Sequence, residues 1–234
     1  MFKRFTALIW LRREIIWANK QIVIQILMPI LMVALYQFMY KDLPIGDKNE
    51  MILFLVLPMV YGFVGFIVAL IISEENEKHN LRSLQLSGVG TPEYLLANLV
   101  YPFFIQLFYI VALPIYLQQS FSKLGGQYII VNIVTSLVTL LIYLLLGILS
   151  NTQSKASIAS LPIMLGISFL PLFAIIEKSL EKWIALTFMG AFIKYSKQLA
   201  DFPLFGQASL ILLLWLVLLL LLIVWALKRI RLQK

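Results

Sequence analysis

Apolar residues in this chain gather in long uncharged blocks, each about as long as a helix that crosses a membrane. A hydrocarbon core about 30 Å thick takes about 20 residues of α-helix. Six blocks reach that length without Asp, Glu, Lys, Arg or His, and they are residues 22–40, 51–72, 95–117, 128–149, 156–176 and 208–227. The pattern predicts an all-α membrane protein with six transmembrane helices in one domain, residues 1–234.

The positions of Lys and Arg predict the orientation of these spans. An even number of spans puts both termini on one side, and basic residues favour cytoplasmic loops. The termini and the loops 73–94 and 150–155 together carry twelve Lys and Arg residues, whereas the three alternate loops carry seven. We therefore expect the protein to lie in the plasma membrane with both termini in the cytoplasm.

Residues 1–20 precede the first span and have the pattern of an amphipathic helix. On a helical wheel one face holds apolar residues and Arg12, which would have to snorkel toward water, while Trp10 and Trp17 flank that face. Its apolar members are Phe5, Leu8, Ile9, Ile15 and Ile16. The pattern predicts a helix lying in the headgroup layer. The alternative is a loosely ordered basic leader held by charge alone.

A shorter apolar stretch, residues 183–193, comes before the last span. Eleven residues are too few to cross a bilayer, and Lys194, Lys197 and Asp201 follow closely. We expect the segment 183–205 to be re-entrant and to cap the outer end of a transport path, with Phe188, Met189 and Phe192 as the candidate outer gate. The alternative is a passive stretch on the outer headgroups.

The composition agrees with a membrane protein, and the distribution of charge argues against nucleic acid as a partner. Hydrophobic residues make up 62% of the chain and charged residues 13%, against about 45–50% and 25% in soluble domains. The net charge of +8 would suit nucleic acid, but the basic residues cluster beside the spans at the two chain ends. Nucleic acid is therefore not an expected partner.

The predicted spans contain uncharged polar residues but no ionisable ones. Proton-coupled carriers and voltage sensors use charged residues within the membrane. The absence of such residues from the predicted spans argues against both functions. The polar residues have two explanations, hydrogen bonding between helices and a surface that contacts a transported substrate. The candidates for such a translocation path are Gln25, Gln37, Gln106, Asn132 and Ser136.

Catalytic and cofactor motifs are missing from the sequence. No nucleotide-binding pattern G-x-x-x-x-G-K-[ST] occurs, and Gly88-Val89-Gly90 lacks the lysine of a phosphate-binding loop. The single histidine, His79, has no second ligand of its type for a metal site. The chain is not expected to be an enzyme or to bind a cofactor, so energy for active transport would come from a partner.

The loop between the second and third spans has the signals of a separate helix, residues 74–87. Ser73 is suited to cap it, and acidic residues favour the positive end of a helix. Glu74 and Lys78 form an i,i+4 pair, and Gly88 suits the position after the last turn. Thr91, Pro92 and Glu93 then read as the start of the third span.

At these residues the chain resembles the ABC-2 type permeases of ABC exporters. That family pattern, roughly E-x-x-x-G-T-L-x-x-L-x-x-x-P, is met by Glu77, Leu81 and Leu84, while His79-Asn80 takes the place of Gly-Thr. The resemblance covers the whole chain, including the basic N-terminal helix and the short apolar segment before the last span. It implies that 74–87 is a coupling helix that docks on an ATPase subunit through Glu75, Glu77, Lys78, Leu81, Arg82 and Leu84.

The resemblance also implies the partners and the activity. Two copies of a nucleotide-binding ATPase would bind ATP and Mg, and a second permease copy or a homologous permease would complete the path. The uncharged spans favour an apolar or amphipathic substrate, such as a peptide, a lipid-like molecule or a drug. The alternative function is a channel or facilitator that is not driven by ATP.

Overall fold

The computed structural model describes residues 2–42, 46–78, 80 and 88–232. Over these ranges all regular structure is helical, which confirms the all-α prediction. Six helices are long and apolar enough to cross a membrane. They are α2 (Lys20–Tyr40), α3 (Lys48–Glu77), α5 (Thr91–Tyr116), α7 (Gln127–Leu149), α8 (Gln153–Ile176) and α11 (Gln207–Leu232).

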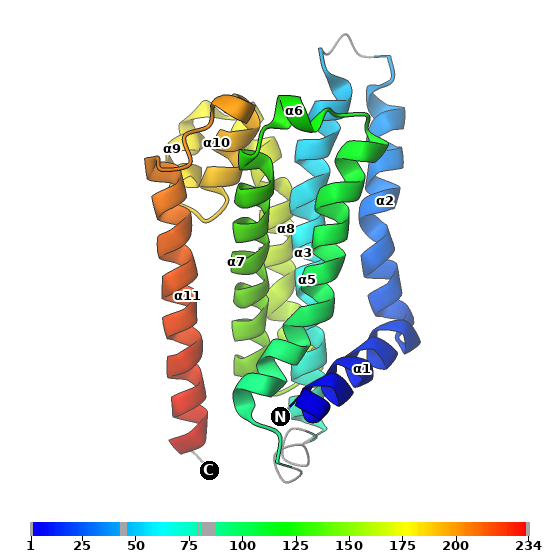
Figure 1. Ribbon diagram of the computed structural model, residues 1–234, viewed down its shortest axis with the longest axis vertical. Coiled ribbons are helices and arrows are strands. Elements are labelled where there is room, and N and C mark those ends of the chain that lie inside the picture. Colours follow the sequence, from blue (N-terminus) through cyan, green and yellow to red (C-terminus); the bar gives the residue numbers. More distant parts are fainter. Residues whose placement is uncertain (1, 43–45, 79, 81–87, 233–234) are drawn as a thin grey trace.

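The helix α3 lies at the centre of the bundle, with α2, α5, α7 and α8 packed around it (Figure 1). In the most apolar 18-residue stretch of α3, 94% of the residues are buried. Residues 52–62 are buried without interruption. A helix that is apolar on all sides belongs in the interior of a bundle. The helix α3 therefore packs against four of the other five candidate spans.

Small residues let the helices approach α3 closely. A Cβ atom at Gly65 would lie 2.3 Å from the ring of Tyr143 on α7, and one at Gly147 would lie 3.2 Å from the Cα of Ala69. The small residues at the start of α8 divide between two environments: Ala156 and Ser160 are fully buried, whereas Ser154 and Ala159 are exposed. Close packing inside a membrane relies on such residues.

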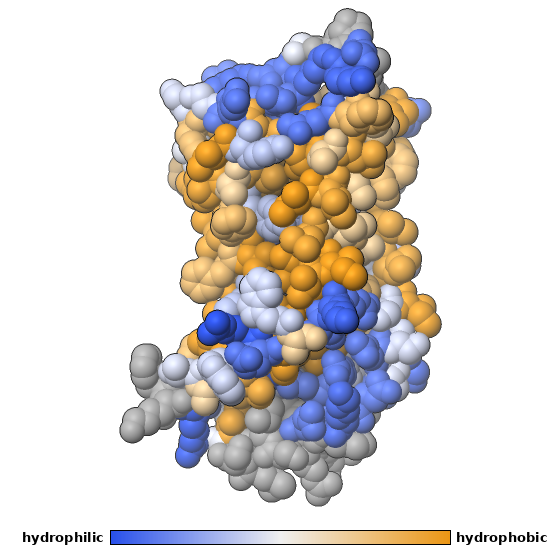
Figure 2. Space-filling model, turned by 90° about the vertical axis from the view of Figure 1, so that its right-hand side faces the viewer, coloured by the Kyte–Doolittle hydropathy of each residue, from blue (hydrophilic) through white to orange (hydrophobic). Residues whose placement is uncertain are grey.

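Both chain termini lie at the same end of the bundle (Figure 1). Next to them α1 (Phe2–Ala18) crosses that end obliquely. The opposite end holds α6 (Phe121–Leu124), α9 (Glu181–Ala185), α10 (Gly190–Gln198) and two short 3-10 turns, Lys178–Leu180 and Leu199–Asp201. An apolar band crosses the middle of the face shown in Figure 2, with hydrophilic residues above and below it. We call the two ends the termini end and the cap end.

The segment that follows the second predicted span does not begin a new helix at Ser73, so that prediction was wrong. Instead α3 continues to Glu77, and the Ser73 hydroxyl donates to the Leu70 carbonyl inside it, at 3.0 Å. Extending an existing helix is easier than nucleating one, and no breaking residue separates Ile72 from Ser73. The predicted ion pair between Glu74 and Lys78 is confirmed.

An ion cluster joins α3 to α6 at the cap end. The Lys123 Nζ lies 2.7 Å from Asp47 Oδ2 and 2.5 Å from Glu50 Oε2, and Gln119 donates to Asp47 Oδ1 at 3.1 Å. The hydrogen bond from Lys123 is the main cause that holds the pKa of Asp47 below its ordinary value. This stabilisation is present above the ordinary pKa and is lost as the pH falls through the lower, folded pKa. The tie is therefore intact at neutral pH.

Candidate functional site

The helix α1 packs on the start of the bundle through the face that its sequence pattern predicts. Leu8 and Ile16 are buried, and α1 lies against α5 and α2. Trp10 and Trp17 stay 59% and 63% exposed on the other side. The ordered contacts argue against a loose leader held by charge alone.

Arg12 does not snorkel to water, contrary to the prediction from its position on the apolar face. Its side chain is 1% exposed, and its guanidinium binds both carboxylate oxygens of Glu75 on α3. The Nη2–Oε2 distance is 2.9 Å. A bidentate pair of this kind neutralises a buried arginine, so Arg12 has its counter-charge inside the protein, although its Nε has no hydrogen-bond partner.

Tyr94 completes this buried cluster from the start of α5. Its hydroxyl donates to Glu75 Oε2 at 2.5 Å, and its ring lies 5.3 Å from the Arg12 guanidinium carbon. Tyr94 is 2% exposed. The three side chains, which we call the junction, connect α1, the last turns of α3 and the first turn of α5.

Glu75, one of the predicted docking residues, is buried. It is 6% exposed and already binds Arg12 and Tyr94, which argues against a direct contact with an ATPase, and its docking role stays a prediction. Lys78 is exposed and pairs with Glu74. The other predicted docking residues Leu81, Arg82 and Leu84 lie outside the described residues.

Further hydrogen bonds attach the end of α3 to the start of α8, through Glu77, and to the end of α7, through Asn76. The carboxylate of Glu77 accepts from the backbone N–H of Gln153 at 2.8 Å. Asn76 donates to the carbonyls of Gly147 and Ser150, at 3.1 and 3.2 Å. Glu77 therefore satisfies a free N–H at a helix start in addition to any role in docking.

The chain that returns from the loop is also fixed. Arg4 of α1 donates to the Gly88 carbonyl at 2.8 Å. The helix α5 then begins at Thr91, with Gly90 rather than Thr91 as its N-cap, and the Gly90 N–H donates to Glu93 Oε2 at 3.1 Å. Both flanks of the loop are thus anchored, one through the junction and Glu77 and the other through Arg4 and Glu93.

Three of the predicted path residues meet in the centre of the bundle. Ser136 on α7 donates to Gln106 on α5, whose amide donates to the Tyr61 carbonyl on α3 at 3.4 Å. The Tyr61 hydroxyl donates to Asn132, which donates to the Tyr128 carbonyl at 2.6 Å. All are buried, so hydrogen bonding between helices, one of the two alternatives, is confirmed for them. Their contact with a substrate stays a prediction.

The other two path candidates lie on α2, away from this centre. Gln25 is half-buried and its Oε1 has no hydrogen-bond partner. Gln37 accepts from the Tyr116 hydroxyl of α5 at 3.5 Å, in an exposed position. The structure therefore does not gather the five predicted residues into one site.

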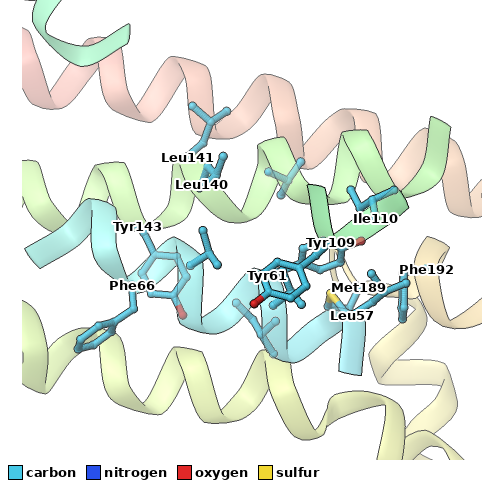
Figure 3. Packing of buried hydrophobic residues seen from close by; sticks show 14 of the residues in the cluster. Leu57, Tyr61, Phe66, Tyr109, Ile110, Leu140, Leu141, Tyr143, Met189 and Phe192 are labelled. Carbon is cyan, nitrogen blue, oxygen red and sulfur yellow. The ribbon is translucent and has the colours of Figure 1, made fainter. Parts of the chain in front are cut away.

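The predicted outer gate residues occupy the bundle at the cap end. Met189 and Phe192 are fully buried beside Leu57 and Tyr61 of α3 (Figure 3), and the Phe192 and Tyr61 rings meet edge to face with centroids 6.1 Å apart. Phe188 packs edge to face against Trp215 of α11 at 6.0 Å. These contacts argue against a passive stretch on headgroups.

Further contacts hold α10 in place. The Tyr195 hydroxyl donates to the Leu124 carbonyl of α6 at 2.7 Å, and its ring packs edge to face on Phe54 of α3. The segment from α9 to α10 is therefore tied to α3, α6 and α11. Its role as a gate stays a prediction.

Comparison with protein families gives a match over most of the chain. A family model described as "ABC-2 type transporter" matches residues 3–199, a range that includes α1, the junction, the loop between α3 and α5, and α10. The curated proteins give no match to this chain.

Proposed function

Because the chain belongs to the ABC-2 type transporter family, we propose that it is the permease subunit of an ATP-driven exporter. The family implies a membrane subunit that works with an ABC ATPase. In the proposed complex two ATPase subunits bind ATP and Mg, and two permease subunits, identical or homologous, form the path. The ATPase pair docks at the termini end, which faces the cytoplasm.

The junction is the observation that carries this proposal. A docked ATPase pushes on the loop between α3 and α5, and both flanks of that loop are anchored to helices. Arg12, Glu75 and Tyr94 join these flanks to α1, so the movement passes to α1, α3 and α5 together. Since α3 is central, it carries the movement to α7 and α8.

The cap end supplies the second half of the mechanism. On α10, Phe192 packs on Tyr61 of α3 and Tyr195 packs on Phe54 of α3. A shift of α3 therefore changes the surface against which α10 packs. In the proposed cycle this releases Phe188, Met189 and Phe192 as an outer gate. The six spans predicted from the sequence contain no Asp, Glu, Lys, Arg or His. Such spans favour an apolar or amphipathic substrate, whether a peptide, a lipid-like molecule or a drug.

A test of the function starts from membranes of the native host. The tagged chain, extracted in mild detergent, is expected to co-purify with a soluble P-loop ATPase in equal amounts. Vesicles with the purified complex should export cargo with ATP, and not when the phosphate-binding lysine of the ATPase is replaced by Ala. Transport that continues without ATP would favour a channel or facilitator, and a preparation without any ATPase would contradict the proposal.

Orientation has a separate test in this cysteine-free chain. Single replacements Phe205→Cys at the cap end and Lys78→Cys at the termini end use exposed positions, Phe205 being 99% exposed. On intact cells a membrane-impermeant maleimide should label residue 205, and it should label residue 78 only after permeabilisation. The reverse pattern would place both termini outside.

A further inference from the structure

The face of α1 that points away from the bundle combines aromatic and basic side chains. Trp10, Arg13 and Trp17 follow one another at spacings of three and four residues and share one side of the helix. Trp10 is 59% and Trp17 63% exposed, and Arg13 is exposed as well. Lys20, at the start of α2, is also exposed. We call these four residues the outward stripe.

The outward stripe ends where the membrane-facing surface of α2 begins. Only Asn19, the N-cap of α2, separates the two helices. From Ile24 onward the exposed residues of α2 are apolar, with Ile24 59%, Leu27 48% and Leu31 60% exposed. Trp17 and Lys20 therefore lie next to the point where the apolar surface of α2 begins, which is the depth where the hydrocarbon of a membrane gives way to headgroups.

Charge and side-chain type identify the occupant. Tryptophan is enriched at the level of the headgroups, where its ring is apolar and its N–H is polar. Arg13 and Lys20 have no ion pair with an acidic residue in the described chain. The exposed Glu14 lies beside Trp10 and Trp17 on the same face, so the surface keeps a net positive charge of one from these three ionisable residues. We propose that the outward stripe binds the phosphate headgroups of anionic phospholipids in the leaflet at the termini end.

This site would regulate the junction, an effect that rests on the proposed function. The opposite face of α1 carries Arg12, which holds Glu75 and, through it, the end of α3. A lipid bound to the outward stripe stabilises the packing of α1 against α3 and α5. Anionic lipid should therefore strengthen the coupling between ATP hydrolysis and transport.

Lipid binding is measured on the permease alone, without an ATPase. The chain is exchanged into nanodiscs that hold phosphatidylcholine with one-third phosphatidylglycerol, and the lipid retained after delipidating detergent is quantified by mass spectrometry. Near a membrane surface each Lys or Arg contributes about a fivefold preference for anionic lipid. The double variant Arg13→Ala/Lys20→Ala should therefore lose at least fivefold of the phosphatidylglycerol enrichment, and Trp10→Ala/Trp17→Ala should weaken retention of both lipids.

The matched control removes two exposed charges at the cap end, Lys182→Ala/Lys194→Ala, and should leave the enrichment unchanged. Thermal unfolding in phosphatidylcholine should be the same for all variants, because every changed residue is exposed. Equal enrichment in wild type and Arg13→Ala/Lys20→Ala would overturn the site.

A second measurement separates this inference from the proposed function. With an ATPase present, transport per ATP hydrolysed should rise with phosphatidylglycerol in the wild type and stay flat in Arg13→Ala/Lys20→Ala. If no ATPase binds the wild-type chain, the proposed function fails while the lipid measurement still decides the site. If the wild-type ratio is independent of phosphatidylglycerol, the regulatory role is overturned.

Discussion

The variant Arg12→Ala is expected to unfold at a markedly lower temperature than the wild type and to uncouple ATP hydrolysis from transport. The replacement leaves the Glu75 carboxylate buried without its counter-charge, and breaking one side of a buried ion pair costs about 3–5 kcal/mol. Both partners are more than nine-tenths buried, so water does little to compensate. Unfolding is measured on the purified chain in detergent by intrinsic fluorescence.

The control for this prediction removes the charges together. The triple variant Arg12→Met/Glu75→Leu/Tyr94→Phe leaves no polar side chain of the junction unpaired, and apolar replacement of a buried pair is often neutral or stabilising. We expect its unfolding temperature to return close to that of the wild type while coupling stays weak, because α1 has lost its specific hold on α3. The neighbouring exposed variant Arg13→Ala should unfold like the wild type. An Arg12→Ala protein as stable as the wild type would contradict the role of the junction.

The variant Gly190→Ala is expected to displace α10 from the cap end. A Cβ atom there would lie 2.5 Å from the carbonyl oxygen of Ala185 and 2.8 Å from its carbon and Cα. These are backbone atoms, so the turn between α9 and α10 has to open. Overpacking of this kind costs about 1–3 kcal/mol, and it moves Met189 and Phe192 out of their buried positions.

Two measurements check this expectation. The unfolding temperature should fall, and limited proteolysis should cut the segment between α9 and α10 faster than in the wild type. Gly126→Ala is the matched control, because Gly126 lies at a helix start at the same end with an ordinary helical backbone and no atom within 4 Å of its Cβ position. Equal proteolysis of Gly190→Ala and the wild type would show that the turn adapts, contrary to the prediction.

Several features followed from the sequence because each has a local or periodic signal. The six spans are blocks whose length matches a bilayer, and the structure has six helices at those positions. The buried side of α1 follows from the spacing of Leu8 and Ile16, which both face the bundle. The pairing of Glu74 with Lys78 follows from one helical turn.

The segment 183–205 at the cap end could be predicted only in part from the sequence. Its length excluded a seventh span, and its apolar residues indicated contact with protein or lipid. Which of these applied depended on Tyr61 and Phe54 of α3 and Trp215 of α11. These partners are distant in the sequence, so the pattern of residues 183–193 did not contain them.

What only the tertiary structure decided was which polar groups from different helices pair with each other, and where α3 ends. The sequence by itself determined that Arg12 lies on an apolar face and that Glu75 lies near the end of a span. Their ion pair joins residues 63 positions apart, and no periodicity within one helix encodes such a contact. The packing of α1 across the termini end brings them together, and the burial that follows makes the pair obligatory because neither charge can stay unpaired in an apolar interior.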